Sequence, residues 1–275
     1  MPELPEVEAV RRELVPFLVG GRIDRVQVRR PDLRRPFPAG FARRLRGTTV
    51  SDLARRGKYL LAQLSSRETL VMHLGMSGSF RIAAARGEPE AHDHVVFEMA
   101  SGVVIAFNDP RRFGVMDLVP SGAIERLPAL GALGPEPLSS AFDGAALAHA
   151  CAGRKTPLKA ALLDQRVVAG LGNIYASDAL NLARLSPRQH AAIIATPVGL
   201  PRPSAHRLAA AIKKVLSRAI DRQARDSDRS HPFRVYDREG QRCPNRGCAG
   251  VIRRITQAGR STFYCSVCQR RATRL

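Results

Sequence analysis

The N-terminal residues carry apolar side chains at helical spacing. The apolar positions recur at steps of three and four residues, at Leu4, Val7, Val10, Leu14 and Leu18. This spacing places them on one face of a helix, and the glycine pair at residues 20–21 favours a helix end. The pattern predicts an amphipathic helix over residues 3–19.

From residue 22 to residue 119 the pattern changes to short apolar runs separated by turn-forming residues. Such runs are typical of strands, and Ser101-Gly102 predicts a tight hairpin turn between the last two. Several short strands at this spacing favour a β-sandwich or barrel. The predicted strands cover residues 25–28, 59–64, 70–74, 95–99 and 103–107.

The rest of the chain is dominated by alanine- and leucine-rich segments. Residues 120–137 are rich in proline and glycine, which predicts a hinge. Apolar spacing then predicts helices at residues 158–168, 174–183 and 205–220. Residues 221–229 combine charges of both signs with almost no apolar residues, which predicts a mobile loop, before a cysteine-bounded hairpin over residues 235–269. We therefore expect an α+β fold with segments 1–120, 121–137 (the hinge), 138–233 and 234–275.

A glycine-rich turn, VAGLGNIY, occupies residues 168–175. Gly170 is expected to end one helix and Asn173 to begin the next as its N-cap. Exposed amides at a helix start bind anions, so two helices joined in this way can hold a DNA phosphate. Ordinary helix capping is the alternative.

Four of the five cysteines form two pairs near the C-terminus, as Cys243-x4-Cys248-x16-Cys265-x2-Cys268. Four thiolates can complete a closed tetrahedral shell, which is the form of a structural zinc site. The segment is too short for a core of its own, so the metal would supply its folding energy. We predict one structural zinc ion (Zn2+), with two disulfides as the alternative. The fifth cysteine, Cys151, is expected to be a small core residue.

The chain is strongly basic. It has 275 residues with 44 Lys and Arg against 24 Asp and Glu, a formal net charge of +20. Such a charge favours a polyanionic partner, either nucleic acid or an acidic membrane surface, although an arginine-rich proteome would also produce it. Between the cysteine pairs, Ala258-Gly259 predicts a turn that directs Arg260 outward, where its guanidinium suits phosphate. A simple solvated face is the alternative.

No segment indicates export or membrane insertion. No apolar run approaches the roughly 20 residues that span a bilayer, and the N-terminus lacks a basic flank followed by an apolar core. These absences favour a reduced compartment, in which paired cysteines bind metal more often than they form disulfides.

Proline at position 2 has a chemical use. Removal of Met1 would leave Pro2 with a free secondary amine, and an α-amine has a pKa of about 7.7–8.0 against about 10.4 for lysine. The neutral amine can attack C1′ of a deoxyribose and form an iminium ion, while Glu3 donates a proton to the sugar oxygen. Proline is also common at position 2 by chance, so this residue alone indicates little.

Several motifs together resemble the formamidopyrimidine-DNA glycosylase family, and they follow the family's order over nearly the whole chain. They are PELPEVE at residues 2–8, RGKY at 56–59, HLGMSG at 73–78, HDH at 92–94, DPRRFG at 109–114, LGPEPL at 133–138, GLGNIYAS at 170–177 and RSTFYC at 260–265.

The resemblance implies the fold and the catalytic residues. It implies an N-terminal helix and β-sandwich domain, a helix-two-turn-helix domain and a zinc β-hairpin, with DNA in a basic cleft between the domains. The implied catalytic residues are Pro2 as the Schiff-base nucleophile and Glu3 as the acid beside it. Glu6 matches a second acidic position in the active site, and Lys58 a basic residue near the reacting sugar and phosphates.

The resemblance also implies the DNA contacts. Met76, Arg111 and Phe113 would fill the gap left by an extruded base, with Arg111 reading the orphaned cytosine and Phe113 wedging between base pairs. Without the family, Met76 and Phe113 would be assigned to the core. Other implied contacts are His73, Asn173 and Arg260 with phosphates, and Lys155 and Tyr175 near the lesion. For His92 and His94, DNA binding and a structural role are equally open.

Two features depart from the family pattern. The segment at about residues 221–233 is shorter than the family's loop over the flipped base and lacks its motif, which leaves the lesion preference open. The first two cysteines are separated by four residues rather than two, which a longer knuckle accommodates.

We therefore expect a bifunctional DNA glycosylase and abasic-site (AP) lyase of base excision repair that removes formamidopyrimidines and 8-oxoguanine opposite C, followed by β- and δ-elimination. It would act in the bacterial cytoplasm, with the nucleoid, as a monomer on double-stranded DNA containing oxidised bases or abasic sites, with no membrane partner. Two alternatives remain: a relative that prefers oxidised pyrimidines, and a DNA-binding protein without turnover.

Overall fold

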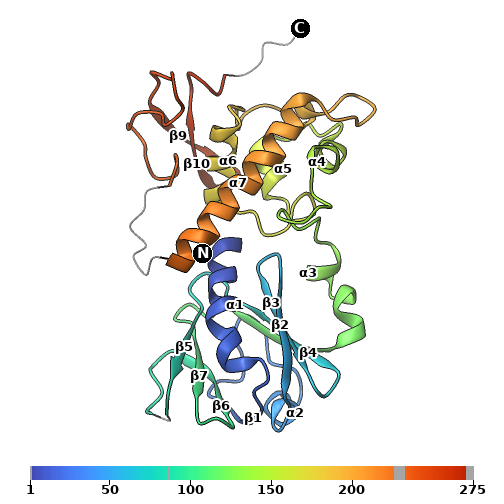
Figure 1. The fold of residues 1–275 in the computed structure, drawn as a ribbon, viewed down its shortest axis with the longest axis vertical. Coiled ribbons are helices and arrows are strands. Elements are labelled where there is room, and N and C mark those ends of the chain that lie inside the picture. Colours follow the sequence, from blue (N-terminus) through green and yellow to red (C-terminus); the bar gives the residue numbers. More distant parts are fainter. Residues whose placement is uncertain (1, 86, 226–232, 271–275) are drawn as a thin grey trace. The chain divides into compact units, whose positions relative to one another are not determined.

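The computed structural model describes residues 2–85, 87–225 and 233–270 (Figure 1). The chain divides into two compact units, Met1–Gly131 and Ala132–Leu275. The predicted domain borders at residues 120 and 137, and a separate hairpin domain from residue 234, remain predictions. Among the described helices, none is long and apolar enough to cross a membrane.

The first unit begins with helix α1 (Leu4–Leu18), which confirms the predicted amphipathic helix. Its buried apolar side chains include Leu4, Val7 and Leu14, which follow the expected spacing. The helix ends before Gly20, whose positive φ of 79° is a conformation that glycine adopts without strain.

Two antiparallel four-stranded sheets follow. Their strand orders are β1-β6-β7-β5 and β2-β3-β4-β8. The first sheet contains β1 (Ile23–Val28), β5 (Ser79–Ala83), β6 (Asp93–Met99) and β7 (Val104–Asn108). The second contains β2 (Val50–Arg56), β3 (Tyr59–Leu64), β4 (Glu68–His73) and β8 (Val115–Pro120), and a short helix α2 (Phe41–Leu45) follows β1.

One buried core joins the two sheets into a β-sandwich, as predicted. It contains Val95 and Ile105 from one sheet, Leu60 and Met72 from the other, and Leu14 from α1. All five predicted strands are present, and the turn at Gly102 joins β6 to β7. The strands that the sequence pattern missed are β2, β5 and β8, and each lies at a sheet edge.

The proline- and glycine-rich segment after β8 is partly helical. It contains the 3-10 helix η1 (Ser121–Arg126) and the short helix α3 (Pro128–Gly131). The border between the two units falls directly after α3.

The second unit is helical up to its C-terminal hairpin. Its helices are α4 (Gly144–Cys151), α5 (Leu158–Leu163), α6 (Asn173–Leu182), η2 (Ala191–Ile194) and α7 (Pro203–Arg225). The predicted helix over residues 158–168 was too long. α5 stops before Asp164, whose carboxylate accepts the backbone N–H of Arg166 at 3.1 Å and so competes with helical hydrogen bonding.

The predicted mobile loop over residues 221–229 was wrong in its first part. Helix α7 continues to Arg225, because arginine, glutamine and alanine at its end are good helix formers. Residues 226–229, and most of the shortened segment up to residue 233, lie outside the described residues.

The C-terminal hairpin consists of β9 (Ile252–Gln257) and β10 (Arg260–Cys265), which pair antiparallel. Its turn has positive φ at Ala258 and Gly259, as the sequence predicted, and Arg260 is exposed.

Candidate active site, DNA contacts and metal centre

The N-terminal residues of α1 are held by the helix itself. Glu3 is the N-cap residue, and its backbone N–H donates to the Glu6 carboxylate at 2.8 Å. The Glu3 residue is only 2 % exposed, while Pro2 is half-buried. Glu6 therefore orients the peptide group that directly follows Pro2, which is a structural use for the second predicted acid.

A buried carboxylate further along α1 ties this helix to the neighbouring sheet. Glu8 accepts hydrogen bonds from Arg11 at 2.8 Å, Arg12 at 3.1 Å and Arg55 at 3.2 Å. Arg55 also donates to the Gly57 carbonyl at 2.9 Å. Burial alone would raise the pKa of Glu8, but the guanidinium hydrogen bonds and charges outweigh it and lower this pKa.

Gly57 and Lys58 form the turn between β2 and β3. Arg55, which bonds to both Glu8 and Gly57, therefore connects α1 with the turn that carries Lys58. The sequence analysis did not assign Glu8 or Arg55, although a glutamate followed by arginines three and four residues later is a pattern of helical ion pairs.

His73 lies at the end of β4, beside this turn in the sheet. Its Nδ1 accepts the Gly75 N–H at 3.0 Å, which places the proton of the neutral ring on Nε2, and its ring lies 4.7 Å from that of Tyr59. Burial, and then the charges of Lys58 and Arg34, lower the pKa of His73 to about 4. The ring is thus neutral at pH 7, with Nε2–H as a donor.

The three predicted void-filling side chains lie on two neighbouring loops, residues 74–78 and 109–114, which we call the crossover loops. Met76 and Phe113 are each 40 % exposed, so a core assignment would be wrong. The guanidinium carbon of Arg111 lies 5.0 Å from the centre of the Phe113 ring. The structure therefore brings Arg111 and Phe113 together at the surface of the first unit.

The two histidines left open by the sequence analysis have different environments. His94 is buried, and its Nε2 lies 2.9 Å from the backbone oxygen of Asp109. His92 is exposed and accepts the Asp109 backbone N–H with its own carbonyl at 3.0 Å. His94 thus supports a crossover loop, while DNA binding by the His92 side chain stays a prediction.

In the second unit, Asn173 does not cap α6, as the sequence had suggested. The N-cap is Gly172, and the Asn173 side chain instead donates to the Ser261 carbonyl at 3.0 Å. Ser261 directly follows Arg260, so the structure brings these two predicted phosphate contacts together.

A buried lysine that the sequence analysis missed supports the same strand. Lys159 of α5 is 1 % exposed, and its Nζ donates to the Ser261 carbonyl at 3.0 Å and to the Thr262 hydroxyl at 2.7 Å. A lysine between leucines in a short helix would ordinarily be read as exposed, so the sequence held no signal for this role.

The last two predicted contacts lie in different surroundings. Lys155 is exposed in the loop between α4 and α5. Tyr175 of α6 is 1 % exposed, and its ring meets that of Phe233 edge-on at 6.3 Å. The Tyr175 ring is therefore part of the core of the second unit.

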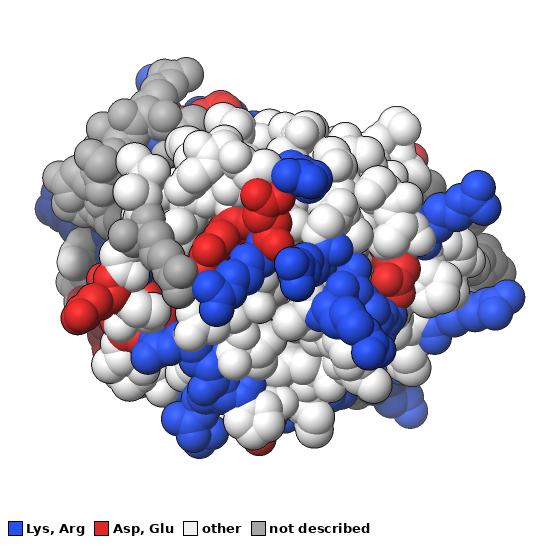
Figure 2. Space-filling model, turned by 90° about the horizontal axis from the view of Figure 1, so that it is seen from below, with Lys and Arg blue, Asp and Glu red and all other residues white. Residues whose placement is uncertain are grey.

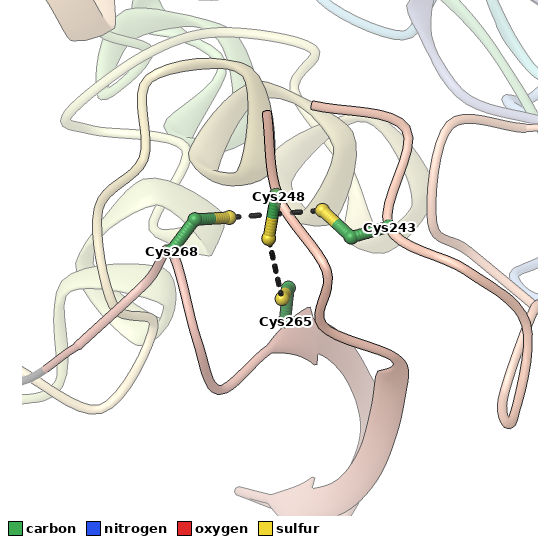
Figure 3. Close-up of side chains that lie close together, drawn as sticks. All are labelled: Cys243, Cys248, Cys265 and Cys268. Atoms are coloured by element: carbon green, nitrogen blue, oxygen red, sulfur yellow. Dashed lines mark hydrogen bonds between the residues drawn. The ribbon is translucent and has the colours of Figure 1, made fainter. Parts of the chain in front are cut away.

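The four C-terminal cysteines converge on one point (Figure 3). Their sulfur atoms all lie within 4.8 Å of one another, with 3.7 Å between Cys243 and Cys268 and 3.6 Å between Cys248 and Cys265. A tetrahedral shell with metal–sulfur bonds of about 2.3 Å requires sulfurs about 3.8 Å apart. All four thiols are unbridged, which excludes the disulfide alternative in this structure. The site can hold one metal ion.

Polar side chains fasten this cluster to α6. Asn245 donates to the Cys268 sulfur at 3.2 Å and to the Asn181 carbonyl at 2.9 Å. The buried Asp178 carboxylate accepts the backbone N–H groups of Arg234 and Val235, each at 2.8 Å. The metal centre and the helix that begins at Asn173 therefore share one hydrogen-bond network.

On one face of the molecule, positively charged side chains are mixed with negatively charged ones. Figure 2 shows a face on which Lys and Arg side chains are interspersed with acidic ones. Several arginines are paired with acids, among them Arg22 with Asp24 and Arg166 with Asp164, both at 2.9 Å. On this face, charge alone therefore does not mark a DNA-binding surface.

Comparison with known proteins decides the family. The formamidopyrimidine-DNA glycosylase N-terminal domain matches residues 1–116, and the H2TH domain of the same enzymes matches residues 133–230. The chain is 53 % identical to formamidopyrimidine-DNA glycosylase of Azorhizobium caulinodans and 55 % identical to that of a Bradyrhizobium species, covering 98 % of this chain and 100 % of each relative. The chain belongs to the formamidopyrimidine-DNA glycosylase family.

Solved structures of formamidopyrimidine-DNA glycosylase agree with this assignment. The Lactococcus lactis enzyme, bound non-covalently to DNA containing an abasic site, matches with a TM-score of 0.87 at 32 % identity. The same enzyme in complex with DNA containing Fapy-dG matches with a TM-score of 0.87 at 31 % identity. Both alignments cover 98 % of this chain and 100 % of the other. The present member of the family is thus a DNA glycosylase of base excision repair with the predicted α+β fold.

Proposed function

We propose that this chain is a bifunctional DNA glycosylase and AP lyase that removes formamidopyrimidines and 8-oxoguanine opposite cytosine, with the Pro2 amine as its nucleophile. The observation that carries the proposal is the linkage around α1. Pro2 directly precedes Glu3, the N-cap of the helix, and Glu6 orients the peptide group between them. Glu8 and Arg55 tie the same helix to the turn of Lys58.

The proposed reaction begins when the Pro2 nitrogen bonds to C1′ and the bond from C1′ to the damaged base breaks, and the Pro2 N–H proton passes to the departing base. Glu3 donates a proton to the sugar ring oxygen as the ring opens, leaving an iminium ion. Loss of a C2′ proton then breaks the bond to the 3′ phosphate, and loss of a C4′ proton breaks the bond to the 5′ phosphate. Water hydrolyses the remaining imine and restores the amine, so a one-nucleotide gap with phosphates at both ends is left.

The remaining predicted residues serve as contacts in this proposal. Lys58 stabilises the negative charge of the phosphates beside the reacting sugar. A neutral His73 donates Nε2–H to a phosphate, and Asn173 and Arg260 form a second phosphate contact on the other unit. Met76, Arg111 and Phe113 occupy the space of the extruded base, and the exposed Lys155 and His92 complete the DNA contacts. The predicted contact Tyr175 is buried, so in this proposal its ring supports α6 from the core.

We also propose that the four cysteines hold one structural zinc ion. The hairpin's buried cluster contains few apolar side chains, among them Val235, Ile252 and Phe263, so metal–thiolate bonds would supply much of its folding energy. Four thiolates leave no open coordination position, which assigns the ion a structural use.

The solved relatives support the substrate class. Their structures contain DNA with an abasic site or with Fapy-dG. We propose double-stranded DNA with oxidised bases or abasic sites as the partner and a monomer as the active form. Excision assays on 8-oxoguanine·C and thymine-glycol duplexes separate this proposal from a preference for oxidised pyrimidines.

Borohydride trapping tests the nucleophile. Reduction of the processed protein with an abasic duplex should give a covalent adduct whose cross-linked peptide starts at Pro2, and Pro2→Gly should lower its rate. Protein that retains Met1 is the matched control, because its Pro2 nitrogen is an amide. If processed protein forms no adduct, the chain binds DNA without this chemistry and the proposal fails.

A further inference from the structure

The crossover loops are paired because the strands around them are paired. Residues 74–78 lead from β4 in one sheet to β5 in the other, and residues 109–114 lead back from β7 to β8. At one end of the loops His73 pairs with Val115, and at the other Ser79 pairs with Asn108. The register of both sheets therefore sets the loops side by side.

A buried carboxylate organises both loops. Asp109 is completely buried, and its side chain accepts the Ser77 hydroxyl at 2.6 Å and the Gly114 N–H at 2.7 Å. Its backbone N–H and C=O bond to His92 and His94. Both the side chain and the backbone of Asp109 are thus hydrogen-bonded, and the bond to the Gly114 N–H sets the path of the loop between these two residues.

The Ser77 hydroxyl bridges the two loops, as a donor to one residue and an acceptor from another. The Ser77 hydroxyl donates its proton to the Asp109 carboxylate, which leaves the hydroxyl oxygen free to accept. The hydroxyl oxygen then accepts the backbone N–H of Arg111 at 3.2 Å. Only a side chain that donates and accepts at once satisfies both neighbours.

Close backbone contact fixes the other side of the same loop. A Cβ on Gly75 would lie 2.3 Å from the carbonyl carbon of Phe113, and Gly75 has a φ of +65°. Arg112, between Arg111 and Phe113, also has a positive φ of 54°. The conformation of the loop over residues 109–114 is therefore restrained at two points. Ser77 bonds to the backbone of Arg111, and Gly75 packs against the backbone of Phe113.

We propose that Ser77 and Asp109 are positioning residues that determine how strongly the enzyme discriminates the base opposite the lesion. They do not touch DNA in this proposal. They hold the backbone of Arg111 in the position from which its guanidinium reads the orphaned cytosine. The inference rests on the proposed function, because it requires that Arg111 reads this base.

Single-turnover excision of 8-oxoguanine opposite C and opposite A tests the inference. Ser77→Ala should lower the C-over-A rate ratio about five- to tenfold, because the Arg111 amide loses its acceptor and the Asp109 carboxylate loses a donor. Borohydride trapping on an abasic duplex should change less than about twofold, since Pro2 lies on another element. Asp109→Asn should act in the same direction. Ser51→Ala, which removes an exposed hydroxyl bonded to the Gln63 carbonyl, is the matched control and should change neither readout.

A double-mutant cycle with Arg111→Ala distinguishes positioning from general loosening. In the Arg111→Ala background, Ser77→Ala should have no further effect on the ratio, because the side chain that it positions is gone. Additive effects, or equal losses opposite C and A together with a lower Tm, would overturn the inference and leave a merely structural role.

If Arg111→Ala itself leaves the ratio unchanged, the assignment of Arg111 in the proposed function is wrong and the inference fails with it. If Arg111→Ala lowers the ratio and Ser77→Ala does not, only the inference fails.

Discussion

The two units hold their candidate DNA contacts by different means. In the first unit, buried carboxylates organise the loops and turns, as Glu8 does for the Lys58 turn and Asp109 does for the crossover loops, above a large apolar core. In the second unit, the strand that follows Arg260 depends on a small cluster that includes the metal-site cysteines and on the buried Lys159.

This difference indicates which change in the protein would disrupt each candidate DNA contact. A carboxylate that accepts several hydrogen bonds needs only the intact fold, whereas the hairpin, in our proposal, also needs a metal ion at its four cysteines. Losing the metal should therefore remove phosphate binding at Arg260 while the first unit stays folded.

The largest effect is expected from loss of the metal. Cys265→Ser, at a fully buried ligand position, should abolish metal binding and weaken DNA binding by at least about a hundredfold, because the hairpin loses most of its folding energy. Metal content and fluorescence anisotropy with an abasic duplex measure the two effects. Cys151→Ala, which removes a buried thiol outside the cluster, should retain the metal. Full DNA affinity without metal would contradict the contrast.

The next effect concerns Glu8. Glu8→Gln should lower the free energy of unfolding by about 3 kcal/mol, because the Arg11 and Arg55 guanidinium groups lose their buried counter-charge. Trapping on abasic DNA should slow as the Lys58 turn loosens. Glu13→Gln, on an exposed position of the same helix, is the control. Because the folded pKa of Glu8 is lowered, its stabilisation is present above a pH of about 4.5 and is lost as the pH falls below it. Equal acid sensitivity of both variants would contradict this role.

A smaller effect is expected at Lys159. Lys159→Met should weaken DNA binding about tenfold and lower stability by about 2 kcal/mol, since the Thr262 hydroxyl and Ser261 carbonyl lose a shared donor. Lys213→Met is a matched control, because Lys213 also donates to a backbone carbonyl, that of Ser139 at 2.8 Å. The slope of log affinity against log salt should fall in the first variant only. Unchanged slopes in both would show that Lys159 does not support the Arg260 contact.

The smallest effect is the pH dependence of His73. Its folded pKa of about 4 lies below the ordinary value of 6.5, so the unfolded chain binds the proton more readily. The stabilisation is complete above about pH 6.5 and is lost as the pH falls towards 4, by about 1 to 2 kcal/mol between pH 7 and pH 5. Denaturant titrations of His73→Gln should show a shallower pH dependence over this range, and an unchanged one would place the pKa elsewhere.

Local patterns in the sequence determined much of this protein. Apolar spacing predicted α1 closely, cysteine spacing predicted the metal cluster, and Ala258-Gly259 predicted the turn that exposes Arg260, because each depends on residues close together in the chain. The motifs identified the family. The missed strands β2, β5 and β8 all lie at sheet edges, where half-exposed positions weaken the alternation, although the edge strand β1 was predicted.

Only the tertiary structure decided how the site residues are held. Ser77 and Asp109 are 32 residues apart in sequence, and Lys159 and Thr262 are 103 apart, so no local pattern indicates either bond. Tertiary packing also moved Asn173 from the expected N-cap to the Ser261 carbonyl and turned Met76 and Phe113 outward. Periodicity encodes which face of an element is buried. The partner that a buried polar group finds depends on packing between distant segments, which local periodicity does not encode.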